Sequence, residues 1–88
     1  MKPSEYIEQH GWCQGELEDD YGRVCIEGSI VRVCDGIEDT AKKDEAIGAI
    51  ERKILAAIPE SVCVLWKWND EPGRTQAEVL KLLRSVGE

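Results

Sequence analysis

The chain has 88 residues, of which 42% are apolar, so it fits a single compact domain spanning residues 1–88 and is too apolar to be disordered. Its formal net charge of −7, from 11 basic and 18 acidic residues, argues against direct binding to a nucleic-acid backbone, which requires clustered cations. No apolar run approaches the roughly 20 residues that span a bilayer, and the first residues lack the apolar stretch of a secretory signal, so we expect a cytoplasmic protein that does not enter membranes.

A short helix is predicted over residues 3–10. Pro3 suits a first turn, acidic residues follow near the positive end of the helix dipole, and Gly11 stops the helix. The residues expected to face inward are Tyr6, Ile7 and His10.

The next two segments differ in how clearly they can be interpreted. Residues 11–24 are rich in turn formers, which favours a loop or a small irregular hairpin. Residues 25–34 are ambiguous: their β-branched residues favour a strand, whereas Ile26, Ile30 and Val33 follow helical spacing. We interpret 25–34 as a buried helix that Gly36 could terminate.

The clearest amphipathic helix follows, with Asp39 or Thr40 as the candidate N-cap and Pro59 as its limit. Isoleucines and one leucine repeat on one face of this helix. Residues 62–68 then alternate with a period of two, which predicts a short strand passing through the core.

The last part of the chain carries the strongest local signals. Residues 69–73 predict a turn, with Pro72 and Gly73 at the central positions of type II geometry. Thr75 and Glu78 match a capping box that opens a final helix. The predicted fold is therefore predominantly α, with about four helices and a short β-hairpin or small sheet; an α+β fold is the alternative.

Four cysteines, Cys13, Cys25, Cys34 and Cys63, are predicted to be free thiols, because disulfides are rare in a reducing cytosol. His10 with Cys13, Cys25 and Cys34 is an alternative zinc set, but it lacks the second closely spaced ligand pair typical of zinc sites. We therefore expect no metal and no other cofactor.

An enzymatic role is not expected. The only nearby nucleophile and base are Cys13 and His10, and two residues three positions apart across a helix end rarely reach catalytic geometry. Neither of the common glycine-rich phosphate-binding patterns occurs.

Three segments together carry a resemblance. Residues 11–15 read Gly-Trp-Cys-Gln-Gly, residues 25–30 read Cys-Ile-Glu-Gly-Ser-Ile, and residues 68–75 read Trp-Asn-Asp-Glu-Pro-Gly-Arg-Thr. The chain resembles a family of uncharacterised small proteins of actinobacteria and other bacteria, which occurs in shortened form in actinobacteriophages. The resemblance implies no activity. The compact connection over residues 16–24 matches the shortened members and so implies a phage-encoded protein.

The candidate partner or ligand surface combines polar and aromatic residues of the first and last of these segments with one further tryptophan: Trp12, Gln14, Trp66, Trp68, Asn69, Asp70 and Arg74. A structural interpretation competes with it. Asn69 and Asp70 would stabilise the turn through local bonds to the backbone, and Arg74 would pair with Asp70.

The hypothesis that follows is a non-enzymatic accessory protein, encoded by a phage, that binds a host or phage protein through an acidic, Trp-containing surface. The acidic character is concentrated in residues 1–21, where Lys2 is the only cationic side chain. The alternatives are a small-molecule or metal-binding domain and an acidic mimic of DNA. Homo-oligomerisation also remains open.

Overall fold

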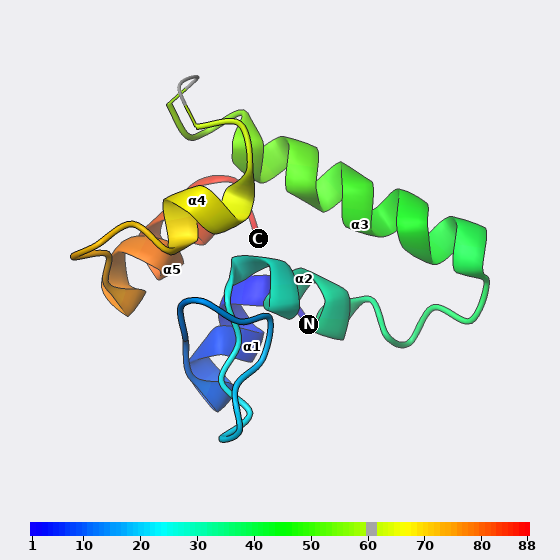
Figure 1. The fold of residues 1–88 in the computed structure, drawn as a ribbon. Coiled ribbons are helices and arrows are strands. Elements are labelled where there is room, and N and C mark those ends of the chain that lie inside the picture. The colour runs from blue at the N-terminus through cyan, green and yellow to red at the C-terminus, as the bar shows by residue number, and fades with distance from the viewer. Residues whose placement is uncertain (60–61) are drawn as a thin grey trace.

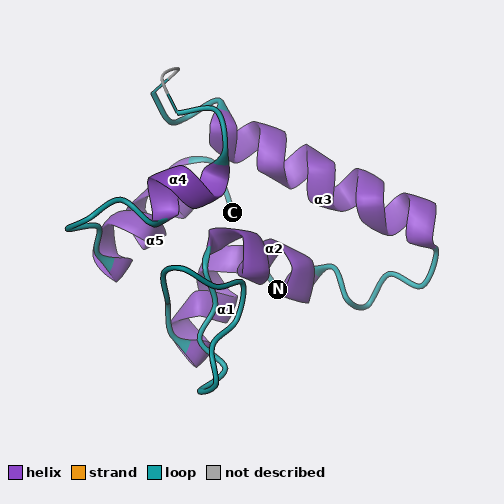
Figure 2. Cartoon of the chain, viewed as in Figure 1, coloured by secondary structure: helices purple, strands orange, loops and turns teal. Residues whose placement is uncertain are grey.

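The computed structural model describes residues 1–59 and 62–88, and within them the chain is mostly helical. No helix among these residues is both long and apolar enough to cross a bilayer. The helices are connected by loops, as Figures 1 and 2 show: α1 (Pro3–His10), α2 (Ile26–Val33), α3 (Thr40–Leu55), α4 (Leu65–Asn69) and α5 (Gln76–Ser85). The predicted predominantly α fold is confirmed.

Helix α2 is the centre of the arrangement, since it packs against α1, α3 and α4. Helix α1 also packs against α5, and α3 against α4 (Figure 1). The first and last segments meet, because the Ser4 amide donates a hydrogen bond to the carbonyl of Glu88 at 2.8 Å. Every helix therefore contributes to one assembly around α2.

The core between these helices is built mainly from aliphatic side chains. Ile26 and Ile30 of α2, one helical turn apart, are fully buried, which confirms the helical interpretation of this segment. The Cys25 sulfur caps α2 by accepting from the Gly28 amide at 3.3 Å. The whole buried cluster is Ile7, Val24, Ile26, Ile30, Ile54, Ile58, Leu65, Val79 and Leu83.

The predicted inward face of α1 is correct in part. Ile7 is buried and Tyr6 half-buried, whereas His10 is exposed and stacks on the Tyr6 ring with centroids 4.1 Å apart. Helix α3 begins after Asp39, whose carboxylate accepts from the Lys42 amide at 3.0 Å, as one of the two predicted N-caps.

The prediction of a strand over residues 62–68 is wrong. Val64 is extended, but Leu65 begins the single-turn helix α4. The period-two pattern would need a neighbouring strand to pair with, and the described residues contain isolated bridges but no strand. A helical turn instead places Leu65 and Asn69, at i and i+4, on the same buried side and leaves Trp66 outside.

The predicted hairpin over residues 11–24 is also not present. Two isolated bridges form there, parallel between Trp12 and Val24 and antiparallel between Glu18 and Val24. Because Val24 takes part in both, the segment folds as a looped strap around one buried residue rather than as two paired strands. This strap spans residues 11–24 and lies against α2.

The turn and cap before α5 form as predicted. The Arg74 amide donates to the Glu71 carbonyl at 3.0 Å, and Gly73 between them has a φ of +85°, which fits a type II turn. The Glu78 amide donates to Thr75 Oγ1 at 3.2 Å, and the Thr75 amide donates to the Glu78 carboxylate at 3.0 Å. The capping box is complete.

Candidate functional site

Asn69 joins the strap to α4. Its side chain is fully buried, and its Oδ1 atom accepts from the indole nitrogen of Trp12 at 2.7 Å and from the Ile26 amide at 3.1 Å. Its Nδ2 atom donates to the Cys13 carbonyl at 3.1 Å and to Asp70 Oδ1 at 2.9 Å. One amide side chain thus connects the strap, the start of α2 and the turn after α4.

Gln14 and Asp70 complete this junction. The Gln14 amide nitrogen donates to the carbonyls of Asn69 and Glu71, at 3.0 and 3.1 Å. The Gly15 amide donates to Asp70 Oδ1 at 3.0 Å. Four of the seven candidate residues, Trp12, Gln14, Asn69 and Asp70, therefore use their polar groups to hold the strap against the turn. The bonds that do so join residues far apart in the sequence, whereas we expected bonds within the turn.

Arg74 makes different contacts from the expected pair with Asp70. Its guanidinium forms ion pairs with Glu71 and Glu78, at 2.5 and 3.2 Å, and its Nε donates to the Trp68 carbonyl at 3.0 Å. The guanidinium carbon also lies 3.6 Å from the centre of the Trp68 ring, a cation–π contact. Trp68 and Arg74 thus stabilise each other beside the start of α5.

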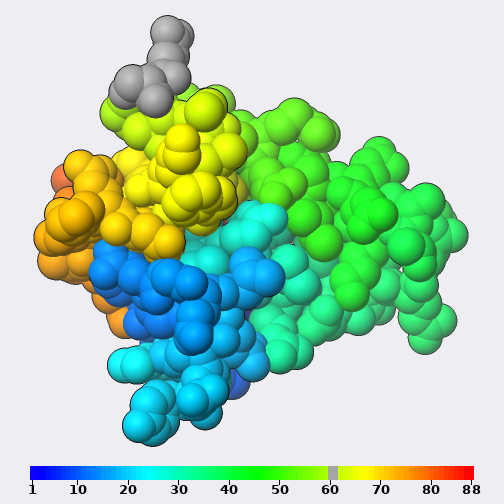
Figure 3. All heavy atoms as spheres, in the orientation of Figure 1, coloured from blue at the N-terminus to red at the C-terminus, as the bar shows by residue number. Residues whose placement is uncertain are grey.

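Trp66 differs from the other two tryptophans, which are half-buried. Its side chain is 57% exposed, and it lines pockets on both of its sides. Figure 3 shows α4 standing on one face of the molecule between the strap and α3. We call this region the Trp66 face and define it as Trp66 with the residues that line these two pockets.

The first pocket, the Leu17 pocket, lies between the strap and α4. Its volume is about 340 Å³, and its lining combines the exposed Leu17 side chain with two carboxylates: Gly15, Glu16, Leu17, Cys25, Trp66 and Asp70.

The second pocket, the Glu27 pocket, lies where α2, α3 and α4 meet. Its volume is about 310 Å³, at the small end of the range for ligand pockets. Apolar groups from α3, from α4 and from the segment before α4 surround two carboxylates and one guanidinium: Glu27, Gly48, Glu51, Arg52, Leu55, Cys63, Val64, Leu65 and Trp66.

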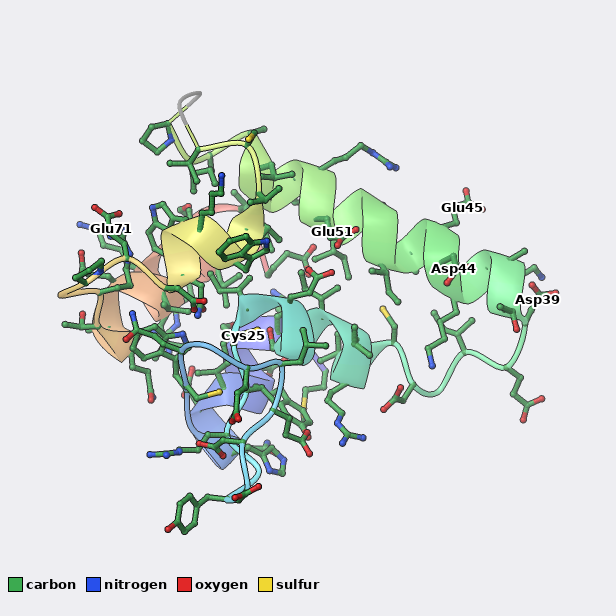
Figure 4. All side chains as sticks on the ribbon, viewed as in Figure 1. Cys25, Asp39, Asp44, Glu45, Glu51 and Glu71 are labelled. Carbon is green, nitrogen blue, oxygen red and sulfur yellow. The ribbon has the colours of Figure 1, made fainter. Side chains whose placement is uncertain are left out.

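Glu27 and Glu51 lie close to each other in the lining of this pocket. Figure 4 shows Glu51 directed from α3 toward α2, where Glu27 occupies the first turn. Burial of the Glu27 carboxyl, its hydrogen bond to Glu51 and the charge of Glu51 together raise the pKa of Glu27 to about 8. The Oε2 atom of Glu27 is shielded from solvent and has no hydrogen-bond partner among residues 1–59 and 62–88.

Sequence reasoning missed this pair. Glu51 is one of several charged residues of α3, and Glu27 is one residue of the segment that opens α2, so the sequence singles out neither. No local pattern could link them, because they belong to different helices and meet only through the packing of α2 against α3.

The candidate zinc ligands are not brought together. The Cys13 thiol donates to the Arg23 carbonyl at 3.3 Å, and burial, with the charge of Asp19 as a further cause, raises the Cys13 pKa to about 11. Burial also raises the pKa of the Cys25 and Cys34 thiols. All four cysteines are free, and the part of the chain that the structure describes holds no group of three or more candidate metal ligands.

Comparison with known proteins identifies a family for the chain. A family model described as "Family of unknown function (DUF6197)" matches residues 3–88. Neither the curated proteins nor the solved structures contain a match to the chain.

Proposed function

Because the chain belongs to the family of unknown function DUF6197, which assigns no activity, we propose its function from its own surface: a non-enzymatic protein-binding module that engages a partner through the Trp66 face. In this proposal the protein is a phage-encoded accessory factor, and the partner is a host or phage protein. Membership in an uncharacterised family agrees with the resemblance seen in the sequence.

The exposure of Trp66 carries the proposal. A tryptophan side chain left 57% exposed loses much of the stabilisation that burial would provide, and tryptophan is strongly enriched at the centres of protein interfaces. Leu17, 59% exposed, lies beside it in the same pocket. Two large apolar side chains and two adjoining hollows provide the kind of surface that a partner could cover.

The charge of the Trp66 face suggests what kind of partner it suits. Four carboxyl groups line its two pockets, from Glu16, Glu27, Glu51 and Asp70. Because the pKa of Glu27 is raised to about 8, three of them carry a full negative charge at neutral pH, beside the guanidinium of Arg52. Lys67 adds a second cation near the edge, with its Nζ 5.8 Å from the centre of the Trp66 ring. The remaining excess of negative charge favours a partner with a basic surface.

The other candidate residues support this surface from behind. Trp12 and Asn69 hold the strap to α4, so that Leu17 and Trp66 are presented on a fixed scaffold. A preorganised surface binds with less loss of conformational freedom than a flexible one. Of the surface predicted from the sequence, Trp12 and Asn69 therefore belong to the support, and Trp66 to the exposed part.

A non-enzymatic role is part of the same proposal. The Cys13 thiol has a pKa of about 11 and donates to carbonyls, which disfavours a thiolate nucleophile at neutral pH. His10 stacks on Tyr6 rather than activating a nucleophile.

Affinity capture with single-residue variants tests the proposal. The full chain is immobilised and exposed to a lysate of the host bacterium, beside the variants Trp66→Ala and Leu17→Ala. Tyr21→Ala is the control, because Tyr21 is an aromatic residue that is 85% exposed and lines neither pocket. We expect the parent chain and Tyr21→Ala to retain the same protein, and the two face variants to lose it.

Capture that survives both face substitutions would contradict the proposal, as would the absence of any captured protein. If the captured protein is a second copy of the chain, the Trp66 face mediates self-association, and the proposal of a host or phage partner is wrong.

A further inference from the structure

The Glu27 pocket holds a carboxyl group whose bonding is incomplete. Glu27 comes from the first turn of α2 and Glu51 from α3, and the nearby Glu51 carboxyl contributes to the raised pKa of Glu27. The Oε2 atom of Glu27 is buried without a hydrogen-bond partner in the described parts of the chain. A buried oxygen in this state gains more from a donor than an exposed oxygen does, because water does not already satisfy it.

The walls of the pocket suit a long side chain with a charged end. Leu55, Leu65 and Trp66 supply apolar surface leading to the two carboxylates. The side chains of lysine and arginine match these walls, because their aliphatic stem packs on apolar groups while their cationic head forms hydrogen bonds. The exposed indole of Trp66 offers a face for a cation–π contact.

The guanidinium of Arg52, which also lines the pocket, is directed along its own helix. It turns back along α3 toward Gly48, with Nη1 3.1 Å from the position that a Cβ of residue 48 would occupy. Burial and Glu51 account for the raised pKa of Glu27, and Arg52 is not among its causes. A bare metal ion is the less suitable occupant, because two carboxylates fall short of the three or more ligands that metal sites normally use, and no such group occurs within residues 1–59 and 62–88.

We propose that the Glu27 pocket receives the ammonium or guanidinium group of a lysine or arginine side chain from the partner that docks on the Trp66 face. The inference rests on the proposed function and specifies the chemistry of that surface. The cationic head lies against Glu27 and Glu51, and the stem lies along Leu55 and Trp66.

Binding of such a cation is linked to a proton. The titratable and charged groups at the pocket come from three helices and the segment before α4. They are Glu27 from α2, Glu51 and Arg52 from α3, Cys63 from the segment before α4 and, over the Trp66 ring, Lys67 from α4. Because the pKa of Glu27 is raised to about 8, its carboxyl is largely protonated at neutral pH. A cation favours the ionised form, so binding releases a proton and strengthens as the pH rises from about 6 to about 9.

Small probes test the pocket without the partner. The full chain, labelled with ¹⁵N, is titrated with n-butylguanidinium, n-butylammonium and the uncharged N-butylurea, and amide and indole shifts are followed by NMR. We expect saturable shifts at Glu27, Glu51 and the Trp66 indole with at least one of the two cations, and affinity at least about tenfold weaker for the urea.

Two variants and a control identify the carboxylates. Glu27→Gln should weaken cation binding by about tenfold and remove its pH dependence. Glu51→Gln should weaken binding by a similar factor but keep the pH dependence, because burial still raises the pKa of Glu27. Glu45→Gln should change neither, since Glu45 is an exposed carboxylate of α3 that does not line the pocket. The amide spectrum of each variant reports directly whether its fold is retained.

Equal binding of N-butylurea, an unchanged affinity in both glutamine variants, or shifts that map outside the pocket would overturn the inference. The two proposals fail separately, because the probe titration requires no partner and the capture experiment with Leu17→Ala does not alter the Glu27 pocket. Cation binding in the pocket together with unimpaired capture by Trp66→Ala and Leu17→Ala would refute the proposed function and the docking partner as the source of the cation, but not the pocket as a cation site. Loss of capture in these variants without cation binding would refute only the inference.

Discussion

The indole nitrogen of Trp12 donates a hydrogen bond of 2.7 Å to the side-chain oxygen of Asn69, a residue 57 positions further along the chain. This bond fixes the strap against α4 and, with the other bonds of Asn69, determines where the Trp66 face lies. Its disruption should therefore affect the whole fold rather than the turn alone.

Asn69→Ala should lower the free energy of unfolding by about 3 kcal/mol. The substitution leaves the Trp12 indole, the Ile26 amide and the Cys13 carbonyl without their buried partner. A role confined to the local turn would cost only about 1 kcal/mol. Urea unfolding monitored by tryptophan fluorescence distinguishes the two values. Asp70→Ala is the comparison, with an expected loss of about 1 kcal/mol, and equal losses in the two variants would contradict the central role of Asn69.

Gly28→Ala should destabilise the protein by about 3 kcal/mol, although alanine is the better helix former. A Cβ at this position would lie only 2.0 Å from the backbone oxygen of Leu17, so α2 and the strap would have to separate. Gly48→Ala in α3 is the matched control, since its nearest neighbour is the flexible end of Arg52. We expect that control to be neutral or stabilising by up to about 1 kcal/mol. Thermal melts of both variants give the answer, and a Gly28→Ala protein as stable as the parent would refute the close contact.

Thr75→Ala should lower stability by about 1 kcal/mol, because it removes the side chain that caps α5. Glu78→Ala should overlap with it, since both side chains act in one capping box. A double-mutant cycle in urea measures this coupling. Glu78 also pairs with Arg74, so its loss alone should be slightly the larger of the two. Strictly additive losses would mean that the box contributes nothing as a unit.

The stability of the parent should fall as the pH rises from about 5 to about 8 by more than that of Glu27→Gln. The pKa of Glu27 is raised to about 8 in the folded state, so the native protein holds a proton that the unfolded chain has already lost in this window. The difference should be on the order of 1 to 2 kcal/mol after allowance for solvent screening. Glu45→Gln should follow the parent. Parallel curves of unfolding free energy against pH for parent and Glu27→Gln would show that the pair does not share a proton.

Thiol titration should find four reactive groups in denaturant and one fast group in the native protein at about pH 8. Cys63 is exposed, whereas Cys13, Cys25 and Cys34 are buried with raised pKa values and react slowly as protonated thiols. Cys63→Ser should remove the fast phase. Fewer than four thiols after unfolding without reductant, or stoichiometric zinc in protein purified without chelator, would contradict the assignment of free, unligated cysteines.

The sequence by itself determined the elements whose signals are local. The Asp39 cap, the positive φ at Gly73 and the Thr75–Glu78 box each depend on contacts within three or four residues, and the structure forms all three. The helical spacing of the isoleucines was likewise sufficient to predict the helix α3. The helix over residues 3–10 and the buried helix within residues 25–34 were obtained in the same way.

The tertiary structure decided the rest, because the deciding contacts join distant segments. Residues 62–68 alternate as a strand would, yet a buried place for Asn69 beside Trp12 and Ile26 makes one helical turn the better solution. Glu27 and Glu51 carry no shared signal along the chain and meet only because α2 packs on α3. Which of the three tryptophans remains exposed depends on the same packing. A periodic pattern in the sequence predicts which residues lie on the same side of an element, but not which side another element will cover.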